Sequence, residues 1–199
     1  MSTMTRPAPI AVPDVFKLTI ERYHQMIDGG ILNEYDDVEL IEGVIRSKMS
    51  KGIPHETIIE KLNRILARLL PADVSHRCQG SLTLDGSEPE PDLLVCTPPE
   101  ARGENHPRAA DTFVVMEVSD SSLGYDRGDK LRVYARAGIP VYWVVNVVDR
   151  QVEVLTDPVT PVGGAPHYRT STIYSPGDTV PLVIRGQPVA ALAVADFMP

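Results

Sequence analysis

The chain has 199 residues, is 43% hydrophobic and carries a formal net charge of -8 at pH 7. Its length and apolar content are enough for one sizeable core, so we expect a single domain over residues 18–199. The acidic balance argues against a protein that coats nucleic acid by charge alone, but it leaves room for an enzyme that acts on nucleic acid through a local basic surface.

The N-terminal segment, residues 1–17, is rich in proline and has no apolar core of the signal-peptide type, so we expect it to be flexible. No apolar run in the chain is long enough to cross a bilayer. The two cysteines, Cys78 and Cys96, form no CxxC motif and are most simply reduced, buried thiols. These features together predict a cytoplasmic protein without a membrane segment.

The first part of the chain predicts two helices with a bent strand or a hairpin between them. Apolar spacing and two closing glycines predict a helix over 18–30. The segment 38–49 is rich in Val and Ile on both sides of Gly43, which indicates a bent strand or a hairpin. The helix expected over 55–70 is the clearest element, because its apolar residues recur at helical spacing and a proline follows.

The middle of the chain predicts short strands joined by one helix. Extended segments are expected at 74–80, 81–86 and 91–96. A proline-containing surface loop follows at 97–111. A strand, a helix and a second strand are then expected at 113–118, 125–138 and 141–147. This order predicts two parallel strands joined by a right-handed crossover.

The last part of the chain is predicted to be all-β. Strands are expected at 151–157, 167–174 and 179–184. Three aromatic side chains upstream, Tyr134, Tyr142 and Trp143, are expected to pack in the core. The fold class is therefore α/β: a mixed sheet flanked by helices, with a β-rich C-terminal third.

Carboxylates beside apolar strands are the first sign of a functional site. Glu117 follows a strand whose apolar residues indicate burial. A buried charge without a partner destabilises the folded state by roughly several kcal/mol. It could lie at the solvent edge, pair with a base or bind a metal. Asp92 leads directly into another apolar strand after Pro91. Glu39 and Glu42 lie on opposite faces of a third strand, so at most one of them faces the side of the sheet that would carry the functional site.

A cation could join these acids. Three carboxylates on adjacent elements repel one another unless a cation binds them, and oxygen ligands with water suit Mg²⁺ or Mn²⁺ better than zinc. Lys130, on the helix after Glu117, could extend over the strand end and stabilise a developing charge. Asp126 lies four residues earlier and could hold it. The alternative is that Lys130 is an exposed helical lysine.

These motifs, taken in order, resemble a known family. Pro91–Asp92, then Glu117 after a strand, then a lysine, resemble the PD-(D/E)XK nuclease superfamily. A more specific set is similar to the Uma-two family of bacterial putative restriction endonucleases, a domain of unknown function. The matching stretches run from Leu18 to Leu155 and read LTIERYHQM, VELIEGVI, PHETIIEKL, EPDLLV, VVMEVSDSS, DRGDKLRVYARAGIPVYWVV and QVEVL.

The resemblance implies a restriction-endonuclease-like sheet with a metal site at one end of its central strands. It implies a Mg²⁺- or Mn²⁺-dependent endonuclease that hydrolyses phosphodiester bonds of DNA. Asp92 and Glu117 become the metal-binding pair, with the backbone carbonyl of Val118 as a further ligand. Glu39 becomes the additional acidic residue of the metal and catalytic site, and Lys130 becomes the catalytic lysine.

Two positions leave alternatives open. The superfamily's lysine lies two residues after the acid, where this chain has Ser119, so Lys130 would have to supply the ammonium group. His55 could contact the scissile phosphate or orient a ligand, or it could simply be a polar residue at a helix start. The acidic charge and Ser119 favour a second hypothesis, a non-catalytic nuclease-fold protein that binds a protein or nucleic-acid partner.

Two further expectations concern partners. Basic residues could steer phosphate if they flank one cleft, or they could be solvated faces; they are Arg46, Lys48, Lys51, Arg127, Lys130, Arg132 and Arg136. A homodimer is expected, because cutting both strands of a duplex is simpler with two sites related by a two-fold axis.

Overall fold

The computed structural model describes residues 15–33, 35–103 and 105–198. Most of the predicted flexible segment, residues 1–14 of 1–17, lies outside this described part. The single domain expected over 18–199 stays a prediction. Among the described residues, no helix combines the length and the apolar character needed to span a bilayer.

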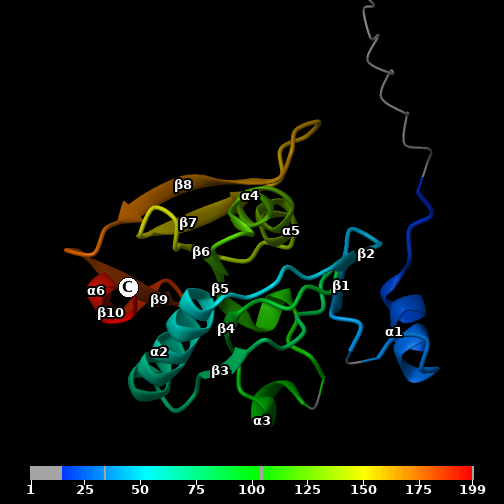
Figure 1. Ribbon diagram of the computed structural model, residues 1–199, viewed down its shortest axis with the longest axis horizontal. Coiled ribbons are helices and arrows are strands. Elements are labelled where there is room, and N and C mark those ends of the chain that lie inside the picture. Colours follow the sequence, from blue (N-terminus) through cyan, green and yellow to red (C-terminus); the bar gives the residue numbers. More distant parts are fainter. Residues whose placement is uncertain (1–14, 34, 104, 199) are drawn as a thin grey trace, which may run out of the picture.

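A six-stranded mixed sheet runs through the centre of the molecule (Figure 1), in the order β3-β4-β5-β6-β7-β8. Its strands are β3 Ser75–Cys78, β4 Leu93–Cys96, β5 Thr112–Ser119, β6 Val141–Asn146, β7 Gln151–Val159 and β8 His167–Tyr174. β5 and β6 pair in parallel, and the other neighbours are antiparallel. The predicted α/β fold with a mixed sheet and the predicted parallel pair are therefore confirmed.

The first half of the chain contributes two helices and a hairpin, and its second helix covers one face of the sheet. It contains α1 Ile20–Asp28, the hairpin of β1 Val38–Ile41 and β2 Val44–Ser47, and α2 Ile53–Leu69. In α2 the side chains of Ile58, Leu62 and Leu66 are buried against the sheet, in the same core cluster as Met116 and Trp143. The helical spacing of these apolar residues is the reason that this element could be predicted from sequence.

The turn of the β1–β2 hairpin has two residues, Glu42 and Gly43, with φ angles of 51° and 78°. Both residues have left-handed backbone conformations. This is the pattern of a type I′ turn, whose twist matches that of the two strands of a hairpin. The N–H of Leu18 donates to the Gly43 carbonyl, and the Gly43 N–H donates to the Gly86 carbonyl, each at 2.8 Å. A side chain at Gly43 would approach the Cβ of Lys17 to 2.8 Å, so this close contact requires glycine.

The opposite face of the sheet is covered by a helical segment after β5. It consists of α4 Leu123–Tyr125, a π-helical turn Asp126–Lys130 and α5 Leu131–Arg136. Val133, Tyr134 and Tyr142 are buried in the cluster on this face. The expected helix over 125–138 therefore exists, but it begins earlier and contains a wide turn. Tyr134, Tyr142 and Trp143 are fully buried, as expected.

The C-terminal region adds a second hairpin on the α2 side (Figure 1). β9 Thr179–Ile184 pairs with β10 Gln187–Ala193, and α6 Val194–Phe197 follows. Sequence reasoning missed β10, α6, the short α3 Pro99–Arg102 and the 3-10 turn Ala109–Asp111. The segment 81–86, expected to be extended, forms isolated bridges only. Both cysteines are free, but Cys78 is exposed, so the prediction of a buried thiol is right for Cys96 alone.

Candidate active site

Alternation along two neighbouring strands brings Asp92 and Glu117 to the same face of the sheet. Leu93 of β4 pairs with Met116 of β5, and both side chains belong to the core under α2. The adjacent residues, Asp92 and Glu117, therefore face the other side, toward the helical segment that carries Lys130. Asp92 is 7% exposed and Glu117 is 4% exposed, so both carboxylates are buried at one end of the strands.

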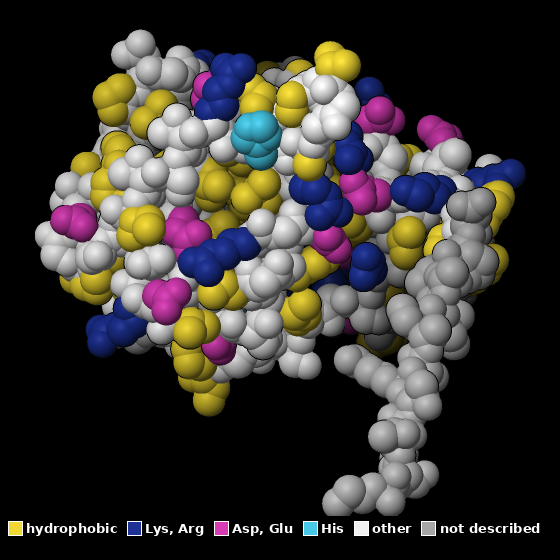
Figure 2. All heavy atoms as spheres, turned by 90° about the horizontal axis from the view of Figure 1, so that it is seen from above, with side chains coloured by type: hydrophobic (Ala, Val, Ile, Leu, Met, Phe, Trp, Pro, Cys, Tyr) yellow, Lys and Arg dark blue, Asp and Glu magenta, His cyan; other side chains and the backbone are white. Residues whose placement is uncertain are grey.

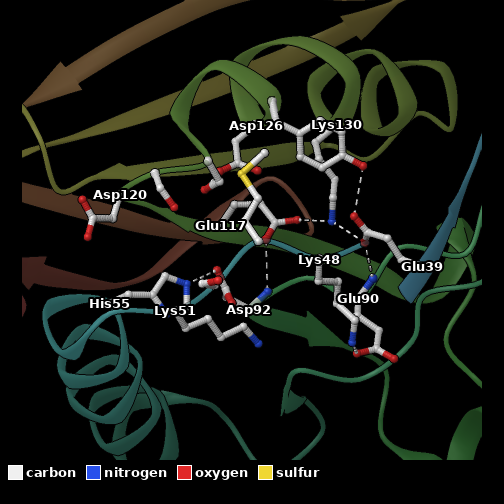
Figure 3. A pocket seen from close by; sticks show the side chains of 15 residues that line it. Glu39, Lys48, Lys51, His55, Glu90, Asp92, Glu117, Asp120, Asp126 and Lys130 are labelled. Carbon is white, nitrogen blue, oxygen red and sulfur yellow. Dashed lines mark hydrogen bonds and ion pairs between the residues drawn. The ribbon is translucent and has the colours of Figure 1, made fainter. Parts of the chain in front are cut away.

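Asp92 is held by backbone and side-chain groups (Figure 3). Its Oδ2 accepts a hydrogen bond from the N–H of Val118 at 2.9 Å and lies 3.1 Å from Nε2 of His55. The N–H of Asp92 donates to Oε2 of Glu117 at 3.2 Å. Within the described residues no hydrogen bond reaches the other oxygen, Oδ1 of Asp92, so this atom is available to a ligand.

The proline before Asp92 deprives one carbonyl of its usual partner. The Ser119 carbonyl accepts from the N–H of Val147, on the β6 side. Alternation along β5 then turns the Val118 carbonyl toward β4; the two strands are paired as far as Leu93 and Met116, and this register, if extended, would bring Val118 opposite Pro91. Because proline has no N–H, it cannot donate to this oxygen. The Val118 carbonyl thus lies on the same side of β5 as the carboxylate of Asp92.

Glu39 enters the same pocket from the β1–β2 hairpin. Its Oε2 accepts from Nζ of Lys130 at 2.7 Å and from the N–H of Glu90 at 3.1 Å. Its Oε1 accepts from the hydroxyl of Tyr125 at 3.0 Å. Glu42 lies in the turn and pairs with arginines on the outside. One glutamate of the two thus faces the pocket, which agrees with the alternation expected for this strand.

Lys130 lies at the centre of the buried charges. Besides its bond to Glu39, its Nζ donates to Oε1 of Glu117 at 3.0 Å, and the residue is only 4% exposed. The rings of Tyr125 and Tyr134 each have their centroids 5.9 Å from Nζ. The hydroxyl of Tyr134 donates to the same Glu117 oxygen at 2.6 Å. The ammonium group is therefore enclosed by two carboxylates and two aromatic rings.

Burial is the largest influence on the pKa values of Glu117 and Lys130, and the neighbouring charges come next. Burial raises the pKa of Glu117 to about 8, although Lys130 acts in the opposite direction and Asp92 adds repulsion. Burial alone would lower the pKa of Lys130, but the charges of Glu117 and Glu39 outweigh burial and raise it. The lysine is therefore protonated, and the site holds more carboxylates than one ammonium can neutralise.

A magnesium ion fits part of this donor set. In the described residues no group of three or more His, Cys, Asp or Glu side chains is arranged to hold a metal. Mg²⁺, however, is commonly bound by one or two carboxylates with water and substrate oxygens. Asp92, Glu117 and the Val118 carbonyl supply such a set of oxygens. The pocket has a volume of about 60 Å³, room for a few waters or an ion rather than for a nucleotide.

Asp126 has a different partner from the one predicted. Its Oδ2 accepts from the hydroxyls of Ser119 at 2.7 Å and of Ser122 at 2.5 Å. Within the described chain the expected hydrogen bond from Lys130 to Asp126 is not formed, because the π turn directs Lys130 toward Glu117. Ser119, at the position where the superfamily carries lysine, is fully buried and has a structural partner.

The other basic residues near the site are largely neutralised by acids. Four arginines pair with carboxylates; the pairs are Arg46–Asp129, Arg127–Glu153, Arg132–Asp129 and Arg136–Glu42. Lys48 lines the pocket and pairs with Glu90 at 2.6 Å. Lys51 also lines the pocket, and no ion pair of Lys51 is found in the described part of the chain. Figure 2 likewise shows basic and acidic side chains interspersed on the face that it presents.

Sequence reasoning missed the two tyrosines of the cluster, and it left His55 open. Tyr134 lies four residues after Lys130 on the predicted helix, a spacing that could have indicated contact with the same site. Tyr125 lies five residues before Lys130, where no helical rule pairs them. His55 is buried beside Asp92, and its Nδ1 has no hydrogen-bond partner among the described residues. It contacts an acid of the site, so it is more than a polar residue at a helix start.

Comparisons with known proteins give the family and the fold of the chain. The Uma2 family, described as "Putative restriction endonuclease", matches residues 20–193. A solved structure described as a putative nuclease belonging to DUF820, from Anabaena variabilis ATCC 29413, is similar with a TM-score of 0.63 and 15% identity. The likeness covers 90% of this chain and 97% of that chain, and at this identity it shows a shared fold. No curated protein matches. Since the family match spans most of the chain, the chain belongs to the Uma2 family, as the sequence motifs predicted.

Proposed function

We propose that this protein is a Mg²⁺-dependent endonuclease that hydrolyses phosphodiester bonds of DNA. The observation that carries the proposal is the convergence of Asp92, Glu117 and Lys130 at one end of β5. These residues come from three separate elements, and all three are buried. The description of the family supports DNA as the substrate.

Asp92, Glu117 and the Val118 carbonyl would hold the ion. When bound, Mg²⁺ polarises the phosphate and lowers the pKa of an attacking water. Within the described residues Oδ1 of Asp92 accepts no hydrogen bond, and Pro91 has no N–H to donate to the Val118 carbonyl, whereas Oδ2 of Asp92 is used to fix the side chain. The hydrogen bonds within the chain thus select which oxygens face the ligand.

Lys130 would supply a positively charged ammonium group next to the phosphate. Its raised pKa keeps the ammonium protonated at neutral pH, so it can stabilise negative charge on the phosphate but cannot accept a proton from water. Both oxygens of Glu39 already accept hydrogen bonds, one of them from Lys130. The same holds for Glu117, whose oxygens accept from Lys130, Tyr134 and the N–H of Asp92, so Glu39 stays the additional acidic residue of the proposed metal and catalytic site.

The substrate would approach the open side of the pocket. The pocket is small, so we place one phosphate of the duplex at the acids and the rest of the duplex outside the pocket. Lys51 lines this pocket and is exposed, and no ion pair of Lys51 is found within the described residues. We therefore place a neighbouring phosphate at Lys51.

Plasmid cleavage tests the proposal. Wild type, Glu117→Ala, Lys130→Ala and the surface control Arg169→Ala are compared with Mg²⁺, with Mn²⁺ and with a chelator. We expect wild type and Arg169→Ala to cleave only with metal. Each site variant should lose at least about 100-fold in rate, the effect typical of removing one preorganised charge-stabilising group. Equal activity in all four proteins would reject the assignment.

Metal titration separates this function from the non-catalytic alternative. Calorimetry should detect Mg²⁺ binding to wild type and much weaker binding to Asp92→Asn, whose side chain keeps an acceptor for the Val118 N–H but lacks the charge. Arg169→Ala should bind as wild type does. Absence of binding, together with tight partner binding by the site variants, would favour a protein that only binds a protein or a nucleic acid.

The homodimer and the cytoplasmic location stay predictions. A dimer would place two sites about a two-fold axis, so that both strands of a duplex are cut in one encounter. Light scattering at working concentration checks this, and a monomeric mass would remove the dimer from the proposal.

A further inference from the structure

A wide helical turn immediately precedes the lysine of the site. In the π turn Asp126–Lys130, the N–H of Leu131 donates to the Asp126 carbonyl five residues back, one residue further than in an α-helix. Such turns are rare, and they occur frequently at functional sites. Lys130 is the last residue of this turn and is buried, so the direction of its side chain depends on the geometry of the turn.

Asp126 attaches this turn to the sheet at two points. Its carboxylate accepts from the hydroxyls of Ser119 and Ser122, at 2.7 and 2.5 Å. Its backbone carbonyl accepts from the hydroxyl of Tyr142, on β6, at 3.0 Å. Ser119 ends β5, and both Ser119 and Tyr142 are fully buried. The first residue of the turn is thus bonded to the two central parallel strands.

We propose that Asp126 is a positioning residue: anchored by Ser119 and Ser122, it fixes the π turn and thereby holds Lys130 against Glu117. The anchor and the lysine are the two ends of one turn, and Glu117 lies two residues before Ser119 on the same strand. The distance between the anchor and the target of the lysine is therefore set by a single buried strand. This inference rests on the proposed function, in which Lys130 acts on the phosphate.

The test removes the anchor without changing any charge. The double variant Ser119→Ala/Ser122→Ala deletes both hydroxyl donors to Asp126. Thr112→Val is the matched control, because its buried hydroxyl lies on the same strand and donates to the Arg108 carbonyl at 2.9 Å, at the opposite end from the site. Both proteins lose a hydrogen bond from a buried hydroxyl of β5, but only the double variant loosens the turn.

Three measurements follow from this design. In a crystal structure of the double variant, Nζ of Lys130 should move away from Glu117, beyond the 3.0 Å of the wild type. The single-turnover rate of DNA cleavage should fall about 10- to 100-fold, as expected for a misplaced reactive group. The dissociation constant for DNA should stay at the wild-type value, because the lysine is misplaced and the surface is intact. Thr112→Val should match wild type in all three respects.

The outcomes separate this inference from the proposed function. A double variant in which Lys130 still contacts both Glu39 and Glu117 would overturn the positioning role, and so would an equal loss of rate in Thr112→Val. If the wild type cleaves no DNA, the proposed function fails, and the position of Lys130 in the variant structure still decides whether Asp126 holds it.

Discussion

Two clusters of ion pairs share one hairpin and one helical segment, but they differ in burial. In the inner cluster, Lys130 lies between Glu39 and Glu117, and these side chains are 3–6% exposed. In the outer cluster, Glu42 pairs with Arg132 at 3.4 Å, with side chains 23% and 35% exposed. Glu39 and Glu42 are three residues apart, yet the turn sends them to opposite sides of the hairpin.

The difference teaches what each kind of pair can do. A solvated pair contributes little to stability and tolerates the loss of a partner, whereas a buried cluster becomes strongly unfavourable when one charge is removed. The outer cluster therefore fastens the hairpin to α5 by weak contacts. The inner cluster holds an ammonium group in one place, and its charges are interdependent.

Removing one cation from each cluster gives the largest expected contrast. Lys130→Ala leaves the buried carboxylate of Glu39 without its counter-charge and removes a hydrogen-bond donor to Glu117, so we expect the free energy of unfolding to fall by about 3 kcal/mol. Arg132→Ala, the matched change outside, should cost less than about 1 kcal/mol. Urea denaturation at pH 7 measures both. Similar losses for the two variants would show that burial does not distinguish the clusters.

The pH dependence of stability sharpens the comparison inside the inner cluster. A carboxyl group whose pKa rises on folding favours the folded state at low pH, and this contribution disappears as pH rises through the folded-state value, here about 8. Glu117→Gln lacks this titration. Between about pH 5 and 8, wild type should therefore lose about 1 kcal/mol per pH unit relative to the variant. Chemical denaturation across this range measures the difference, and a flat difference would contradict the raised pKa.

Salt gives the smallest effect and concerns the outer cluster. Glu42→Gln removes a charged partner of the half-buried Arg132 and the exposed Arg136, so we expect a loss of about 0.5 kcal/mol at low ionic strength. In 1 M NaCl, where the screening length is about 3 Å, this loss should vanish. The effect of Lys130→Ala should persist at the same salt concentration, because solvent ions do not enter the buried cluster. Denaturation in low and high salt checks both statements.

Burial explains why three of the predicted elements could be recognised in the sequence. β5, β6 and α2 are covered by apolar neighbours along their length, so their composition and spacing reveal them. β10 was missed because most of its residues are exposed or half-buried and its sequence is rich in alanine. The region 81–86 has strand-like residues, but it crosses the molecule without a continuous strand partner.

The sequence indicated several residues of the candidate site, but it indicated fewer of the hydrogen bonds between them. Asp92, Glu117 and Lys130 could be named because a charge beside an apolar strand needs a partner. Alternation alone left Glu39 and Glu42 open, and the family resemblance selected Glu39. The partner of Asp126 depended on a π turn, and a hydrophobic pattern with a period near four residues does not distinguish this turn from an α-helix.

The two-residue turn of the β1–β2 hairpin also limits how the chain can change in length. Gly43 is bonded through its N–H and its carbonyl to separate loops, so the turn cannot slide. One extra residue between Glu39 and the turn would exchange the inner and outer faces of β1 and leave Lys130 with a single carboxylate. Relatives should therefore accumulate insertions in the mostly exposed connection 160–166, between β7 and β8, and conserve the length of the hairpin.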